Sequence, residues 1–129
     1  MRDYDALAAY VAEREAVPFR WNGHTCAHFV ASAVQAQTGR NPLNGLRLTW
    51  TTEKGALRAL KRLGGLEAAV DALLPETPVA RADRGDVGLV EGERGPFLVL
   101  IEGLTLAAVG SMGLERLPRR RLIKAWGAE

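Results

Sequence analysis

Three short apolar segments in the second half of the chain place the strongest limit on its fold. Each is separated from the next by a turn that contains glycine, and the segments are DVGLVE (Asp86 to Glu91), FLVLIE (Phe97 to Glu102) and LTLAAV (Leu104 to Val109). The middle segment is almost continuously apolar, which is typical of a strand covered on both faces. The sequence GERG between the first two segments favours a hairpin, so an antiparallel sheet is expected.

The first half of the chain carries helical periodicity instead. Apolar spacing and end signals predict helices from Asp3 to before Pro18, from Thr25 to Gly39, from Thr52 to Gly64 and from Leu66 to before Pro75. Near the C-terminus, Pro118 is expected to begin a short helical turn, followed by an extended piece that holds Trp126. Helices followed by antiparallel strands predict an α+β fold, with the helical part at about 1–75 and the strand part at about 84–129.

Length and charge narrow the class of protein. A chain of 129 residues with 47% hydrophobic and 25% charged residues predicts one globular domain over 1–129. The 17 Lys and Arg against 15 Asp and Glu leave a net charge of +2, too small an excess to predict a nucleic-acid partner. The longest apolar run, Phe97 to Gly110, is too short to span a bilayer, and the acidic N-terminus does not match a signal peptide. We therefore expect a soluble protein made in a cytoplasm.

The single cysteine lies between the two histidines of the chain, in the segment WNGHTCAHFV. Cys26 falls in the first turn of the second predicted helix, where the helix dipole favours a thiolate and hence a nucleophile. Its place on the apolar stripe of that helix is equally typical of a small core residue. His28 is two residues away and does not face Cys26 on a helix, whereas the direction of His24 is not set by periodicity. No further Cys or His completes a zinc site, so neither a metal nor a cofactor is expected.

Four segments in order resemble a known family: PFRWNGHTCAHFVASAVQAQTGRNP, TEKGALRALKRLGG, RADRGDVGLVEG and the terminal KAW. They are similar to a small phage-borne family related to the NlpC-type cysteine peptidases of the papain-like superfamily. The resemblance extends from about Phe19 to Trp126. It implies a papain-like NlpC-type domain, with N-terminal helices packed on a small antiparallel sheet. It also implies cleavage of amide bonds in cell-wall peptides, with Cys26 as the nucleophile.

The sequence departs from this family where the other catalytic groups are due. The resemblance places a histidine base at the start of the second strand and an orienting polar residue on the next strand, but Gly95, Pro96, Phe97 and Leu98 occupy the first place and Ala107 and Ala108 the second. A thiol near its reference pKa of about 8.5 is only a few per cent thiolate at neutral pH. Assistance by a general base contributes roughly a hundred- to ten-thousand-fold in rate. His24, from the loop before the helix, is the remaining candidate for that role.

The departures favour a protein that is not an enzyme. On the resemblance, we expect a structural or assembly protein of a phage-type tail on a catalytically degenerate NlpC-like fold. Its partners would be other phage or tail proteins, and its location the host cytoplasm during synthesis and then the virion or tail particle. The alternative is an active cysteine amidase or peptidase that uses Cys26 and His24 on a peptidoglycan peptide. A third interpretation is a module that binds a small ligand or a partner in the former cleft.

Two other groups of residues have plainer interpretations. The basic cluster Arg119 to Arg121 is interpreted as a solvated face, because most runs of charge are exposed to water. The three tryptophans, Trp21, Trp50 and Trp126, are interpreted as core anchors or interface residues.

Overall fold

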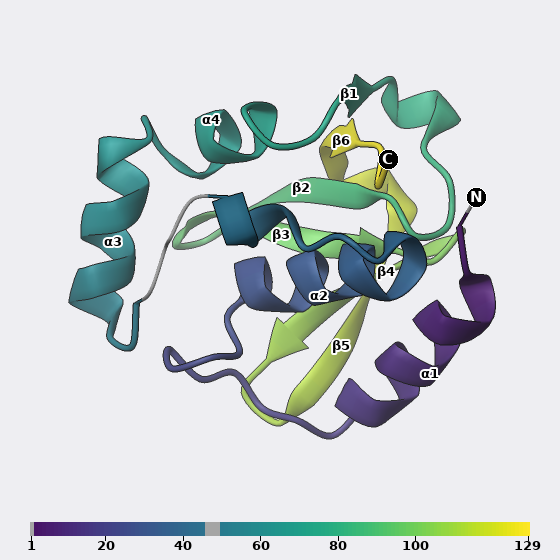
Figure 1. Ribbon diagram of the computed structural model, residues 1–129, viewed down its shortest axis with the longest axis horizontal. Helices are drawn as coiled ribbons and strands as arrows, with labels where there is room; N and C mark the ends of the chain where they lie inside the picture. The colour runs from purple at the N-terminus through teal and green to yellow at the C-terminus, as the bar shows by residue number, and fades with distance from the viewer. Residues whose placement is uncertain (1, 46–49) are drawn as a thin grey trace.

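A computed structural model describes residues 2–45 and 50–129, and within these ranges helices precede a six-stranded antiparallel sheet (Figure 1). The predicted α+β class is therefore confirmed. The helical elements are α1 (Tyr4–Arg14), α2 (Cys26–Thr38), η1 (Pro42–Gly45), α3 (Glu53–Arg62), α4 (Leu66–Asp71), η2 (Val79–Arg81) and η3 (Arg119–Arg121). The strands are β1 (Glu76–Thr77), β2 (Val87–Gly92), β3 (Gly95–Ile101), β4 (Thr105–Gly110), β5 (Gly113–Pro118) and β6 (Leu122–Trp126).

The sheet has the order β1-β6-β2-β3-β4-β5, and its central hairpin is the one expected from the sequence GERG. The three predicted strands are β2, β3 and β4, and the predicted turn and extended piece after Pro118 are η3 and β6. Strands β3 and β4 pair only at Leu100↔Ala107 and Ile101↔Leu106. The β4–β5 hairpin turns away beyond these pairs (Figure 1), and the first half of β3 therefore does not pair with β4.

Strand β5 was not expected from the sequence. Its segment, GLERLP, has no apolar run, and it carries two charges and a terminal proline. The strand forms because a two-residue turn at Ser111 and Met112 folds it back along β4, with pairing from Thr105↔Pro118 to Gly110↔Gly113. It lies at the edge of the sheet, where charged residues and proline are common because one side of the strand has no partner strand.

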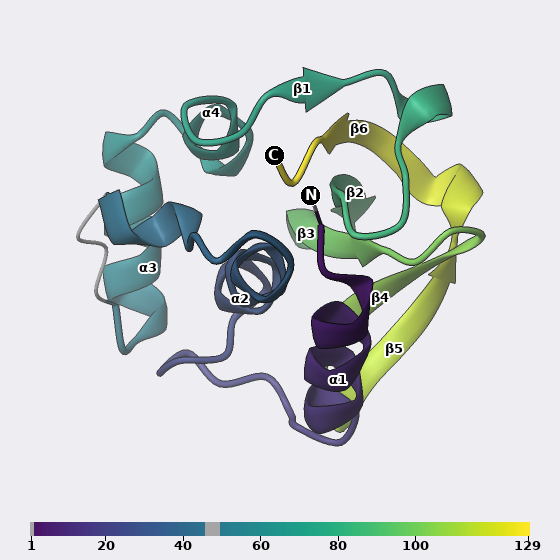
Figure 2. The same ribbon diagram turned by 45° about the vertical axis from the view of Figure 1, so that its right-hand side comes forward.

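Helix α2 lies across the sheet, with α1 on one side and α3 on the other (Figure 2). Its predicted ends are confirmed: Thr25 is the N-cap, and Gly39 ends the helix with a φ of +81°. The apolar stripe expected on α2 is largely confirmed, because Phe29, Val30, Ala33 and Val34 are buried and Cys26 is half-buried. Burial also extends beyond the stripe to Ala27, Ala31 and Gln37, and Gln35 is the one exposed residue of the helix. Helix α1 and η1 pack against α2 and contribute to this wider burial.

The continuously apolar β3 is buried on both faces, as predicted. Leu98 and Leu100 belong to the core that includes α2, whereas Val99 and Ile101 belong to a second core on the other face of the sheet. This division follows from the alternation of side chains along a strand. The position of β3 between the two cores fixes its first half against the start of α2, where Cys26 lies.

The cluster Arg119 to Arg121 is only partly a solvated face. The guanidinium of Arg119 donates to the carbonyl oxygens of Gly103, Val79 and Ala82, at 3.0, 2.9 and 2.6 Å. Arg119 therefore ties η2 to the β3–β4 turn, whereas Arg120 is exposed. Within residues 2–45 and 50–129, none of the helices has the length and apolar character needed to cross a bilayer.

Candidate functional site

A cleft of about 850 Å³ opens at the start of α2. Its walls come from the loop before α2, from α3 and from the β2–β3 turn, so three segments far apart in the sequence meet there. The lining is largely apolar and aromatic, and its residues are Phe19, Trp21, Thr25, Cys26, Ala27, Trp50, Glu53, Ala56, Leu57, Leu60, Leu66 and Gly92 to Phe97. Of the two candidate site residues of the sequence, Cys26 lines this cleft and His24 does not.

Cys26 is the first residue of α2 and lines this cleft. Its side chain is half-buried and packs against the core beneath the helix. Burial raises the pKa of the thiol, and backbone hydrogen bonds with Leu98 and Ala27 oppose this rise without reversing it. The thiol form is therefore favoured at neutral pH, even though the sulfur lies at the positive end of a helix dipole.

His28 is committed to the start of α2. Its Nδ1 accepts from the backbone N–H of Thr25 at 3.2 Å and lies 2.8 Å from the Thr25 hydroxyl oxygen, while the His28 N–H donates back to that oxygen at 3.4 Å. This reciprocal arrangement is a capping box with histidine in the place usually held by Glu or Gln. Because Nδ1 is an acceptor, the hydrogen of the neutral ring lies on Nε2. The ring packs on Trp50, with 5.5 Å between centroids, and burial lowers its pKa.

His24 is placed away from the cleft lining. It is only 4% exposed, its backbone pairs with Arg20, and its ring meets Phe29 edge-on with 6.0 Å between centroids. Burial lowers its pKa, as does the positive charge of Arg14. In the described part of the chain, no hydrogen-bond partner reaches its Nε2. The structure thus puts Cys26 in the cleft and leaves His24 in the packing behind α2.

The segment of β3 that faces Cys26 offers main chain and an aromatic ring. Pro96 and Phe97 line the cleft, and the backbone of Leu98 contacts the sulfur. Further along the sheet, Ala107 and Ala108 are buried. These are the positions at which the resemblance to NlpC-type peptidases puts a base and an orienting residue. Of the described residues that line the cleft, none is a histidine.

The charged residues of the cleft lie at its rim. Glu53, Glu93 and Arg94 are all exposed. Among residues 2–45 and 50–129, no group of three or more His, Cys, Asp or Glu side chains is arranged to hold a metal ion. The arrangement is suited to binding an apolar group between charged edges. The sequence did not predict this set, because its aromatic members belong to separate segments and share no motif.

A family model described as Domain of unknown function (DUF6950) matches residues 1–128. The chain belongs to this family. The match includes every element of the fold, from α1 to β6, so the cleft and Cys26 belong to the DUF6950 domain and not to an added segment. No curated protein matches the sequence.

Proposed function

We propose that the protein is a structural or assembly component of a phage-type tail, built on a catalytically degenerate NlpC-like fold. The surroundings of Cys26 carry this proposal. The cysteine begins a helix that packs on an antiparallel sheet and opens on a cleft, as in the NlpC-type enzymes that the sequence resembles. Where those enzymes supply a base, this chain has Pro96, Phe97 and Leu98. The phage setting comes from the sequence resemblance.

The chemistry of the thiol supports a role other than catalysis. Attack on an amide needs a thiolate and a group that accepts its proton. Burial raises the pKa of Cys26, so at neutral pH the thiolate is an even smaller fraction than the few per cent of a free thiol. The Nδ1 of His28 is occupied by Thr25, and His24 does not line the cleft. What remains is a cleft with an aromatic wall, which is suited to holding a partner.

The alternative function is a working cysteine amidase or peptidase on cell-wall peptides. One observation favours it: Cys26 occupies the first turn of α2 on the wall of an open cleft, which is the usual place of a nucleophilic cysteine. In this case the base would have to come from a movement of His24 out of its packing against Phe29.

A cleavage assay separates the two functions. Purified protein would be incubated with defined muropeptides at neutral pH, and the products followed by mass spectrometry, beside the Cys26→Ser variant. We expect no cleavage by either protein. Cleavage by the wild type that disappears in Cys26→Ser would overturn the proposal in favour of the enzyme.

On this proposal a phage encodes the chain, and the tail role is tested in that phage. Cys26→Ser should leave particle assembly and infectivity unchanged, whereas a Trp21→Asp, Leu57→Asp double variant should be missing from purified particles. Leu104→Asp is the matched control, because Leu104 is also an exposed apolar residue (87%) but lies at the β3–β4 turn outside the cleft. Normal incorporation of the cleft variant, or particles that never contain the protein, would contradict a structural role through this surface.

A further inference from the structure

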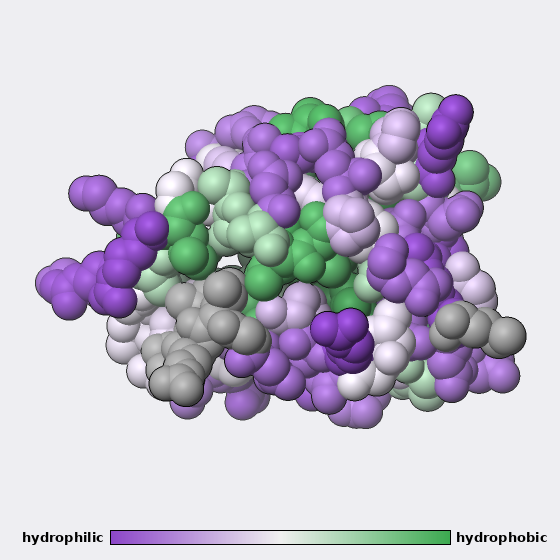
Figure 3. Space-filling view, turned by 45° about the horizontal axis from the view of Figure 1, so that its top comes forward, coloured by the Kyte–Doolittle hydropathy of each residue, from purple (hydrophilic) through white to green (hydrophobic). Residues whose placement is uncertain are grey.

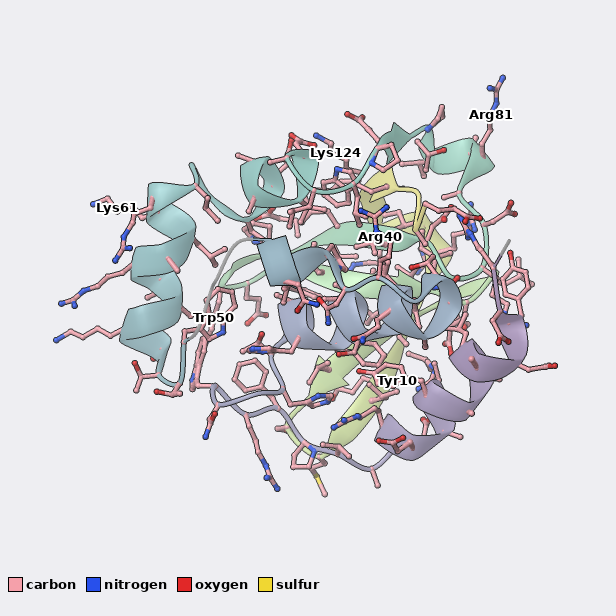
Figure 4. All side chains as sticks on the ribbon, viewed as in Figure 1. Tyr10, Arg40, Trp50, Lys61, Arg81 and Lys124 are labelled. Atoms are coloured by element: carbon pink, nitrogen blue, oxygen red, sulfur yellow. The ribbon has the colours of Figure 1, made fainter. Side chains whose placement is uncertain are left out.

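The outer face of α3 is a strongly basic surface beside the cleft. Lys54, Leu57, Arg58 and Lys61 are spaced i, i+3, i+4 and i+7, so they share one side of the helix, and all four are exposed. Arg62 extends this charge at the end of α3. Figure 3 shows hydrophilic side chains projecting at the α3 end of the molecule, and Lys61 points into solvent in Figure 4.

These cations differ from the paired cations of the chain. Arg2, Arg116 and Lys124 each bind carboxylates within 3 Å. By contrast, the part of the chain that the structure describes places no carboxylate within ion-pair distance of the four cations of α3, which are Lys54, Arg58, Lys61 and Arg62. Glu53 is the one acid of that helix. Four neighbouring uncompensated cations make a local positive potential that attracts an anionic partner.

The basic face continues into the cleft through exposed apolar side chains. Leu57 is 58% exposed and Trp21 is 37% exposed, and both line the cleft. Further in, Trp50 is 6% exposed, and its indole N–H finds no acceptor among the described residues. Trp50 lies between α3 and α2 (Figure 4).

We propose that α3 and the cleft together bind an acidic segment of another polypeptide in an extended conformation. An apolar side chain of the segment enters the cleft beside Trp21 and Leu57. The carboxylates that flank it pair with Lys54, Arg58 and Lys61. This proposal names the class of partner for the cleft described above and rests on the proposed function for its setting in a tail.

The chemistry of the cleft favours a polypeptide over other anionic partners. Glu53 and Glu93 line the same cleft and repel the closely spaced phosphates of a nucleic acid. A cleft of about 850 Å³ accepts a protruding side chain, which the flat surface of a bilayer does not supply. A polypeptide can instead place its acids opposite α3 and leave neutral residues opposite Glu53 and Glu93.

Binding is tested with a short fluorescein-labelled peptide that carries one tryptophan between acidic residues. Two comparison peptides replace the acids by their amides or the tryptophan by serine. We expect saturable binding of the first peptide by fluorescence anisotropy, weaker binding of both comparisons, and a loss of affinity as salt is raised. Arg58→Glu with Lys61→Glu should weaken binding by about tenfold or more, as is common for close charge pairs across an interface.

A matched pair of substitutions controls for net charge. Arg81→Glu with Arg120→Glu changes the charge by the same amount on exposed side chains, and Arg81 lies at the far end of the molecule from α3 (Figure 4). Circular dichroism and urea unfolding establish that both double variants are folded. Equal binding of the acidic and amide peptides, or equal losses in the two double variants, would overturn the proposal.

Two further measurements distinguish other classes of partner from a polypeptide. They also distinguish a failure of this proposal from a failure of the proposed function. Tighter binding to single-stranded DNA or to phosphatidylglycerol vesicles than to the acidic peptide would contradict a polypeptide partner. If the peptide does not bind but the Trp21→Asp, Leu57→Asp protein is missing from particles, the tail function stands and the acidic partner is wrong. If the peptide binds as expected but particles never contain the protein, the partner class stands and the tail function is wrong.

Discussion

The guanidinium of Arg2 donates a hydrogen bond of 2.6 Å to the carboxylate of Asp86, 84 residues further along the chain. The same carboxylate accepts from the backbone N–H groups of Asp83, at 2.8 Å, and Ala128, at 3.2 Å. Asp86 is buried at the entrance to β2 and therefore joins both ends of the chain to the sheet. The two ends also meet directly, because the guanidinium of Arg2 lies 3.5 Å from the carboxylate of Glu129.

Replacing Asp86 by alanine should destabilise the fold strongly. The substitution removes the acceptor of two backbone donors and the shorter ion pair of Arg2, which keeps the carbonyl of Arg84 at 3.1 Å and the carboxylate of Glu129 at 3.5 Å. We expect a loss of about 3 kcal/mol in the free energy of unfolding. Urea denaturation measures this value. Asp83→Ala is the control, because the exposed side chain of Asp83 should change stability by no more than about 0.5 kcal/mol. Similar losses in the two variants would show that the carboxylate of Asp86 has no special role.

Gly85→Ala should be more harmful than Gly39→Ala, although both glycines have positive φ values of +95° and +81°. A Cβ atom at Gly85 would overlap the buried side chain of Gln37, whose Nε2 donates to the Gly85 carbonyl oxygen at 2.9 Å. Gly39 has open space at the same position. We expect a loss of about 1–2 kcal/mol for backbone strain at Gly39, and a larger loss at Gly85 because Gln37 must also move. Thermal unfolding of both variants measures the difference, and equal losses would contradict the overlap.

Stability should fall on mild acidification. The pKa values of His24 and His28 are lowered in the folded state, mainly by burial, so the unfolded chain takes up protons first. The contribution of the two histidines is fully present above their unfolded pKa of about 6.5 and is lost as the pH falls through the lower native values. Urea midpoints between about pH 7.5 and 5.5 measure the slope, in a range above the usual titration of carboxylates.

The variant His28→Gln measures the contribution of His28, the histidine in the capping box, to this pH dependence separately from that of His24. Glutamine at this position still accepts from the N–H of Thr25, because it is a normal member of a capping box, but it does not titrate. The variant should therefore keep most of its stability at pH 7.5 and show a shallower decline below pH 6.5. An unchanged slope would mean that His28 does not contribute to the acid sensitivity.

Alkylation of Cys26 should be slow in the folded protein. Burial raises the pKa of this thiol, so its thiolate fraction at pH 7.5 is below that of an exposed cysteine. Iodoacetamide labelling followed by intact-mass spectrometry should be at least about tenfold slower in buffer than in denaturant at the same pH. Labelling as fast as that of a free thiol, or a midpoint in the labelling rate below about pH 8, would show an activated cysteine and support the enzyme alternative.

Local signals predicted the parts of the candidate site that lie within one element. Thr25 as N-cap, Cys26 in the first turn and Gly39 as the stop all depend on residues within one helix. The separation of Cys26 from His28 followed from the same helical geometry. The cleft could not be predicted in this way, because Trp21, Leu57 and Phe97 come from segments that meet only in the folded chain. The basic face of α3 could not be recognised as part of a site from the sequence either. Its spacing predicts only that the charges share one side of a helix, and their position beside the cleft depends on the fold.

By itself, the sequence determined the α+β class and the central hairpin, and it limited the imidazole bases to two histidines. Periodicity, turn residues and composition are properties of the chain alone. Tertiary structure decided the rest. It formed β5 by pairing a polar segment with β4, it buried α2 between neighbouring helices, and it drew His28 into the capping box and His24 behind the helix. These outcomes depend on hydrogen bonds and apolar contacts between distant segments, and a local pattern carries no information about which distant surface will cover it.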